Sequence, residues 1–214
     1  MTQVVVTIED DRIETRGLRQ YFGSELVIAV PRAMARDSAA AVRQITQQIA
    51  AGDIPPVLDR PFPYGFWLIQ FRRAADGSIS IAELVPESMT FEDGLSRAVA
   101  CRRAQEEQCA KAGVTFSPPC IEQLVAVSPE LLADNGLVQG VRYPSPEHMS
   151  GWWLVDEAFD GSAASMKPIH LGHVAARRPD VLPFLALPFG YRFSVIGHEV
   201  DIWYDEVVAK DPIE

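Results

Sequence analysis

Two histidines near the carboxyl end of the chain have the spacing of metal ligands. His170 and His173 are three residues apart, which would place both imidazoles on one face of a helix, and His198 or Asp156 could complete the site in space. A small metal-dependent hydrolase would use such a site. The pair has no HExxH motif and no cysteine ligands beside it, and two histidines alone are more often surface or capping residues. We therefore expect no bound metal and no other cofactor.

A serine hydrolase triad can be drawn from Ser165, His170 and Asp180, but no GxSxG turn is present to make the serine reactive. The chain also lacks the glycine-rich loops that bind nucleotide phosphates. Its three cysteines fall in no CxxC pair, so we interpret them as reduced thiols: Cys101, Cys109 and Cys120. The sequence offers no convincing catalytic residues, and we expect that the protein is not an enzyme.

The composition is that of a globular protein with a substantial core. The chain has 214 residues, of which 48% are hydrophobic. No apolar run reaches the roughly 18 residues that a membrane helix requires. The first residues lack the basic and apolar regions of a signal peptide. We therefore expect a cytoplasmic protein that does not contact a membrane.

The chain is strongly acidic. Nineteen basic residues against 29 acidic ones give a formal net charge of −10, which repels nucleic acid and acidic membrane surfaces. Residues 147–214 hold eleven acidic and five basic residues, a balance of −6. Such a surface would attract a basic partner, although ordinary solubilising charge explains the same numbers, and charge alone favours that second interpretation.

The first part of the chain alternates short strands with helices. The pattern predicts strands at 4–8 and 26–30, a helix at 38–52, a hairpin over 66–85 and a helix over 90–112. Asp76-Gly77 is the strongest turn signal, and Trp67 lies in a strand that is apolar on both faces, so we expect it in the core. Thr90 can cap the last helix. That helix has a mixed apolar and polar face, which would suit a homodimer contact.

The segment 143–151 holds two prolines and two serines, which is typical of a linker. We place a domain boundary near residue 146, between an amino-terminal domain at 1–146 and a carboxy-terminal one at 147–214. The second is small for independent stability, so we expect it to dock on the first. The predicted class is α+β: an amino-terminal mixed sheet with packed helices, followed by a small α+β unit.

The carboxy-terminal part predicts a strand at 152–155, a helix at 169–177, a short helical turn from Pro179 and a hairpin of strands 191–195 and 199–204. It also contains an unusual ordered set of motifs: Gly151-Trp152-Trp153, Arg178-Pro179-Asp180, Leu185-Ala186-Leu187-Pro188-Phe189-Gly190-Tyr191-Arg192-Phe193, and Trp203 with Asp205. Over residues 150–206 this set resembles the Imm33 family of bacterial immunity proteins.

The resemblance implies a cytosolic antidote to a secreted antibacterial toxin, of the kind found in polymorphic and type VI systems. Such a protein binds its cognate toxin and blocks the toxin's active site or assembly. A toxin that cleaves nucleic acid must be basic where it holds its substrate, so an acidic protein could occupy that surface. We therefore expect a nuclease effector as the partner and no direct contact between this protein and nucleic acid.

The residues predicted to bind the toxin combine aromatic anchors with acidic groups. They are Trp152, Asp156, Glu157, Asp160, Glu199, Asp201, Trp203, Asp205 and Glu206. In an extended strand, Asp201, Trp203 and Asp205 point one way, and we predict that this face contacts the toxin. The alternative is that Trp203 anchors the core and the two aspartates turn away from it.

Overall fold

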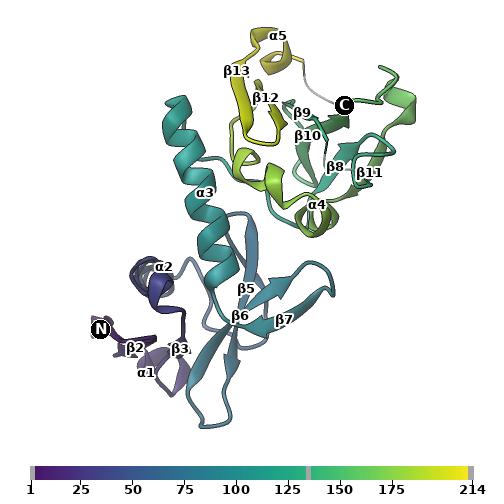
Figure 1. Cartoon of the computed structure of the whole chain (residues 1–214). Coiled ribbons are helices and arrows are strands. Elements are labelled where there is room, and N and C mark those ends of the chain that lie inside the picture. The colour runs from purple at the N-terminus through teal and green to yellow at the C-terminus, as the bar shows by residue number, and fades with distance from the viewer. Residues whose placement is uncertain (1–2, 134–135, 212–214) are drawn as a thin grey trace. The chain divides into compact units, whose positions relative to one another are not determined.

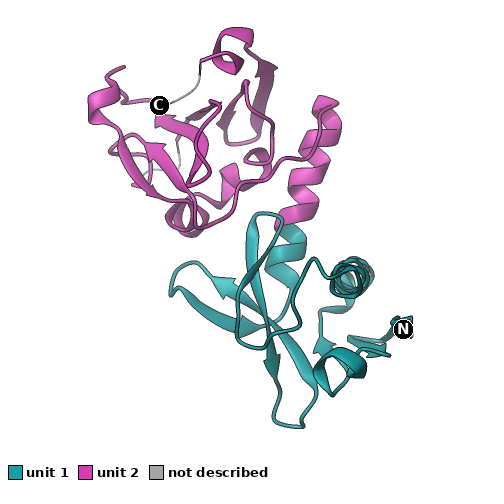
Figure 2. Ribbon diagram, turned by 180° about the vertical axis from the view of Figure 1, so that it is seen from behind, with its two compact units in different colours: residues 1–100 teal, residues 101–214 magenta. Residues whose placement is uncertain are grey.

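The computed structural model describes residues 3–133 and 136–211, and the chain divides into two compact units, 1–100 and 101–214 (Figure 2). Each unit combines helices with a largely antiparallel sheet structure, so the predicted α+β class is confirmed. The division falls within helix α3 (Ser96–Ala112). The expected boundary near residue 146 lies instead inside one sheet of unit 2, between two strands that pair with each other.

Unit 1 contains two antiparallel sheets. The first has the order β1 (Val5–Glu9), β2 (Arg12–Arg16), β3 (Val27–Ala29). The second has the order β4 (Phe62–Tyr64), β5 (Trp67–Arg73), β6 (Ile79–Val85), β7 (Thr90–Asp93). The helices before β4 are α1 (Arg19–Phe22), the short η1 (Arg32–Met34) and α2 (Ala35–Ala51).

The core of unit 1 forms where the pattern predicted apolar faces. Along α2, Val42, Ile45 and Ile49 are buried, and Gly52 ends the helix at a φ of 87°, a left-handed conformation that glycine adopts without strain. Trp67 is buried in β5, and its indole N–H donates to the Leu84 carbonyl at 2.9 Å. The 66–85 hairpin and the end of this helix are confirmed, whereas α2 begins at Ala35 instead of at residue 38.

The start of α3 differs from the prediction. Thr90 does not cap a helix, because residues Thr90–Asp93 form β7 and pair with β6. The helix begins at Ser96, where the buried carboxylate of Glu83 accepts hydrogen bonds from the backbone N–H groups of Arg97 (3.1 Å) and Ala98 (2.9 Å). A cap supplied by a neighbouring strand therefore overrides the local signal.

Unit 2 is built on a six-stranded sheet, in which all neighbouring strands are antiparallel except β8 and β10. Its order is β11 (Lys167–His170), β8 (Leu124–Val127), β10 (Met149–Asp156), β9 (Val138–Arg142), β12 (Tyr191–Ile196), β13 (Glu199–Tyr204). Its remaining helices are η2 (Ala163–Ser165), α4 (Leu171–Arg177), η3 (Pro179–Phe184) and α5 (Glu206–Ala209). Figure 1 shows β12 and β13 side by side, and β13 is an outer strand.

One face of this sheet carries the core of unit 2. The Phe193 ring lies 5.2 Å from Trp152 and 5.0 Å from Phe184, between the sheet and η3. Gly140 pairs with Phe193 across β9 and β12, and a Cβ at Gly140 would come within 2.2 Å of the Phe193 ring. Only glycine leaves room for the ring at that position.

The loop from Leu185 to Gly190 is held by Arg142 and Trp152. The indole N–H of Trp152 donates to the Leu185 carbonyl at 2.9 Å, and the Arg142 guanidinium donates to the carbonyls of Leu185 and Leu187. Helix α3 contacts this loop and the end of η3 before it: Gln105 donates to the Leu182 carbonyl at 3.0 Å, and the Cys109 thiol to the Ala186 carbonyl at 3.4 Å. These bonds position the loop that leads into β12.

Candidate functional site

The exposed apolar residues of the chain gather near its carboxyl end. Six of the ten large apolar side chains that are exposed among the described residues lie between residues 189 and 207: Phe189, Ile196, Val200, Trp203, Tyr204 and Val207. We call these six, together with the exposed acids Glu199, Asp201 and Glu206, the hairpin surface. An exposed apolar patch with charged residues around it is typical of a protein-binding site.

The prediction that Asp201 and Trp203 share a face is confirmed. In β13 the side chains of Glu199, Asp201 and Trp203 alternate with those of Val200, Ile202 and Tyr204. Trp203 pairs with Arg192, opposite the face on which Phe193 is buried, and it is 42% exposed. Trp203 is therefore not a core anchor, and the alternative placement is wrong.

The carboxylate of Asp205 is engaged in contacts within the protein. Its carboxylate accepts hydrogen bonds from the backbone N–H groups of Val207 (3.0 Å) and Val208 (3.3 Å), which caps α5, and it forms an ion pair with Arg192 at 2.8 Å. Loss of hydration would raise the pKa of Asp205, but the hydrogen bonds and the charge of Arg192 together lower it. Asp205 fixes the position of α5 beside the hairpin.

A groove runs along the other side of β13. Its volume is about 680 Å³, and α3 forms one wall with Gln108, Lys111 and Ala112. The hairpin forms the opposite wall, with Tyr191, His198, Val200, Ile202, Trp203 and Tyr204. The rings of Tyr191 and Tyr204 contact each other at 5.3 Å, and Tyr204 is 54% exposed. Apolar and aromatic walls with a few polar groups are typical of a recognition groove.

Half of this groove was not predicted from the sequence. The predicted contact face held Asp201, Trp203 and Asp205 and left out Ile202 and Tyr204, and the 90–112 helix had no part in the predicted site. The alternation in β13 did show that both faces of the strand carry large apolar groups. The position of Gln108 and Lys111 opposite them depends on the packing of α3 against the 182–186 segment, which no local pattern encodes.

The other predicted contact residues lie elsewhere. Trp152 is fully buried and cannot contact a partner, so its assignment as a contact residue is wrong. Asp156 ends β10, separated from β13 by two strands, and accepts a hydrogen bond from the Ser128 hydroxyl. Glu157 and Asp160 are exposed in the loop that follows, where Asp160 accepts hydrogen bonds from Ser162 and Ser165. The predicted set thus divides into a hairpin group and a separate loop group.

The histidine pair does not share a helix. The expected helix at 169–177 begins only at Leu171, because Lys167–His170 pairs with β8 as β11. The ring Nδ1 of His170 lies 2.7 Å from the Glu122 carbonyl, whereas His173 is exposed on α4. In residues 3–133 and 136–211, no three His, Cys, Asp or Glu side chains gather closely enough to hold a metal ion.

The triad drawn from the sequence is not assembled either. The Ser165 hydroxyl donates to Asp160 at 2.9 Å, and the Asp180 carboxylate pairs with Arg178 at 2.7 Å. The three cysteines are free thiols, and burial raises the pKa of each, that of Cys101 to about 12. A thiol with a raised pKa is a poor nucleophile near neutral pH.

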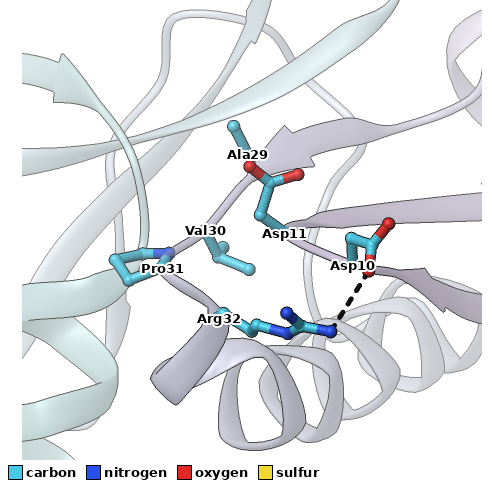
Figure 3. A pocket seen from close by; sticks show the side chains of 6 residues that line it. All are labelled: Asp10, Asp11, Ala29, Val30, Pro31 and Arg32. Carbon is cyan, nitrogen blue, oxygen red and sulfur yellow. Dashed lines mark hydrogen bonds and ion pairs between the residues drawn. The ribbon is translucent and has the colours of Figure 1, made fainter.

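Another hollow, of about 740 Å³, lies in unit 1 (Figure 3). Figure 3 shows the Asp10 carboxylate directed at the Arg32 guanidinium across it, at 3.4 Å. Both side chains are about 85% exposed, so solvent screens their attraction. The remaining lining is Asp11, Ala29, Val30 and Pro31, which offers no convergent polar groups for a ligand.

A known protein-family model matches most of unit 2. Residues 104–205 match the model of the Imm33-like domain. This part of the chain is therefore similar to the Imm33-like domain, and the match includes the groove walls and all of β13. It begins within α3, well before the motifs that carried the resemblance in the sequence. No curated protein and no solved structure matches the chain.

No helix in the described part of the chain is both long enough and apolar enough to cross a membrane.

Proposed function

We propose that this protein is an immunity protein that binds a cognate secreted antibacterial toxin through the hairpin surface and blocks the toxin's active site or assembly. The observation that carries the proposal is the Imm33-like match over a region in which exposed apolar and acidic residues gather in and beside one hairpin. The aromatic groups Trp203 and Tyr204 would supply most of the affinity, and the acids would steer encounter and orientation.

The charge favours a basic partner. Glu199 and Asp201 are exposed on β13, and among the described residues neither has an ion-pair partner. A nuclease effector, for example of a type VI secretion system, exposes basic residues where it binds phosphates, so it would meet these acids. Such an antidote would act in the cytoplasm, where a nuclease toxin meets its substrate.

Self-association through the 90–112 helix remains a prediction. One side of α3 is already occupied, because Gln105 and Cys109 donate hydrogen bonds to the 182–186 segment of the same unit. The exposed positions along this part of the helix are mostly charged, including Glu107 and Lys111, which pair at 2.9 Å. Light scattering on the purified chain decides whether it is a dimer.

Co-expression tests the proposed function. The chain is produced in susceptible bacteria together with the toxin-like protein encoded beside its own gene, and survival and complex formation are measured. We expect protection by the wild type and loss of protection by the double variant Trp203→Ala/Tyr204→Ala, with binding about a hundredfold weaker because two aromatic anchors are removed.

Val57→Ala is the matched control, because Val57 is an apolar residue of similar exposure in unit 1 and is expected to retain protection. If the wild type neither binds the neighbouring protein nor protects the cells, the proposed function is wrong. If the double variant protects as well as the wild type, the toxin is bound by another surface.

A further inference from the structure

The outer edge of β13 has unpaired backbone groups. The Asp205 N–H donates to the Gly190 carbonyl at 2.8 Å. Because hydrogen-bonded and non-hydrogen-bonded residue pairs alternate along an antiparallel ladder, this bond shows which residues of β13 are bonded to β12. Trp203 and Asp201 therefore exchange hydrogen bonds with β12, whereas the peptide groups of Val200, Ile202 and Tyr204 point away from the sheet. No described residue bonds to these outward N–H and C=O groups.

The two edges of the six-stranded sheet differ. The opposite edge strand, β11, contains Pro168, which has no N–H to donate, and begins with the charged Lys167. Proline and lysine on an edge strand are common devices against pairing with another chain. β13 contains neither proline nor lysine. Strand pairing is therefore discouraged at β11 and left open at β13.

The acids of β13 disfavour a second copy of this chain. If two β13 strands paired antiparallel about Ile202, Glu199 of each would lie opposite Asp205 of the other. If they paired about Val200, Asp201 would lie opposite Glu199. Like charges directly opposite each other in a ladder are destabilising, whereas lysine or arginine at those positions would pair with the acids.

The groove would accommodate the side chains on one face of an incoming strand. Side chains opposite Val200, Ile202 and Tyr204 would enter the space between the hairpin and Gln108 and Ala112 of α3. That wall is apolar on the hairpin side, so the incoming residues there would be apolar. Because successive side chains of a strand alternate between its faces, a fitting segment alternates basic and apolar residues.

We propose that β13 is a docking strand, and that the partner adds an extended segment of alternating basic and apolar residues to its free edge. This inference rests on the proposed function and specifies how the hairpin surface engages its partner. Backbone hydrogen bonds to Val200, Ile202 and Tyr204 would provide affinity, and Glu199, Asp201 and the groove would select the sequence.

Amide exchange tests the docking mode without the toxin. The full chain, labelled with ¹⁵N, is titrated with a capped peptide in which lysine alternates with valine, and with a second peptide in which glutamate replaces lysine. We expect the lysine peptide to slow exchange at Val200, Ile202 and Tyr204 and not in β11, and we expect the glutamate peptide to have no such effect.

Two substitutions separate backbone pairing from side-chain contact. Ile202→Pro removes an outward N–H that β12 does not use, and we expect it to weaken peptide binding about tenfold or more. Ile202→Thr keeps that N–H and is expected to bind within about threefold of the wild type. If Ile202→Pro lacks the near-ultraviolet signal of the buried Trp152, Val200→Pro replaces it.

The inference is overturned if the lysine peptide leaves all three amides unprotected, if both peptides protect them equally, or if the proline variant binds like the threonine variant. If the protein protects cells from its toxin but fails the peptide test, only the proposed docking mode is wrong. If it passes the peptide test but gives no protection, only the proposed function is wrong.

Discussion

Arg142 and Trp152 donate hydrogen bonds to the same acceptor, the carbonyl oxygen of Leu185, and the Arg142 guanidinium lies 5.8 Å from the Trp152 ring. The guanidinium also lies 4.8 Å from the Phe189 ring. Burial lowers the pKa of Arg142 to about 10, so the guanidinium stays charged at neutral pH. Backbone carbonyl oxygens, and not a carboxylate, accept its hydrogen bonds and stabilise the charge. This pair joins the sheet to the loop that leads into the hairpin surface.

Removing the donors of Arg142 should destabilise the protein strongly. Arg142→Met keeps the length of the side chain but leaves the buried carbonyls of Ser150, Leu185 and Leu187 without this donor. We expect a loss of about 3 kcal/mol in the free energy of unfolding, measured by urea titration with tryptophan fluorescence. The exposed Arg36→Ala serves as control, with a change within about 0.5 kcal/mol. Equal midpoints for the two variants would contradict the role of Arg142.

The contact between Gly140 and Phe193 predicts a coupled pair of substitutions. In Gly140→Ala the new methyl group would overlap the Phe193 ring, and we expect a loss of about 1–3 kcal/mol. Phe193→Leu makes room for that methyl, so the double variant should lose less than the sum of the two single losses. Thermal or urea unfolding of all four proteins measures the coupling. Strict additivity would show that the ring does not restrict residue 140.

A carboxylate in unit 1 should give stability that depends on pH. Burial alone would raise the pKa of Glu25, but hydrogen bonds from the N–H groups of Gly17, Leu18 and Arg19 and from the Thr15 hydroxyl together lower it. A carboxyl whose pKa is lower in the folded state stabilises the fold above its unfolded pKa, and this stabilisation is lost as pH falls through the folded pKa.

Glu25→Gln should therefore be less stable than the wild type at neutral pH, and this difference in stability should shrink as the pH falls below the ordinary glutamate pKa of 4.5. Urea unfolding between pH 7 and pH 3 measures it. Glu9→Gln, at an exposed position on β1, controls for the loss of one negative charge. A gap that is the same at every pH would show that the carboxylate is not the cause.

Charge reversal distinguishes the hairpin group from the loop group of predicted contact residues. We expect Asp201→Lys to slow association with the toxin about tenfold at low salt, with a smaller effect at high salt. Glu157→Lys makes the same charge change at an exposed residue of the loop group and should leave the rate within about twofold. Surface plasmon resonance at two salt concentrations measures both. The opposite ranking would place the contact at the loop after β10.

The sequence predicted those elements whose signals are local. The hairpin at Asp76-Gly77, the end of α2 at Gly52 and the β12–β13 hairpin all depend on residues within a few positions of one another. Alternation in β13 also predicted that Asp201 and Trp203 share a face, because the side-chain period of a strand does not depend on its partners. The resemblance to immunity proteins likewise came from residues that are close together in the chain.

The other features of the fold and of the site were decided only by the tertiary structure, because each of them depends on contact with a residue that is distant in sequence. Glu83 set the start of α3, and pairing with β8 made His170 part of a strand. The bond from Trp152 to the Leu185 carbonyl placed that tryptophan in the core. The groove likewise required α3 to pack against the 182–186 segment and face β13. Periodicity shows which faces an element has, but the choice of a partner for each face is made by packing between elements.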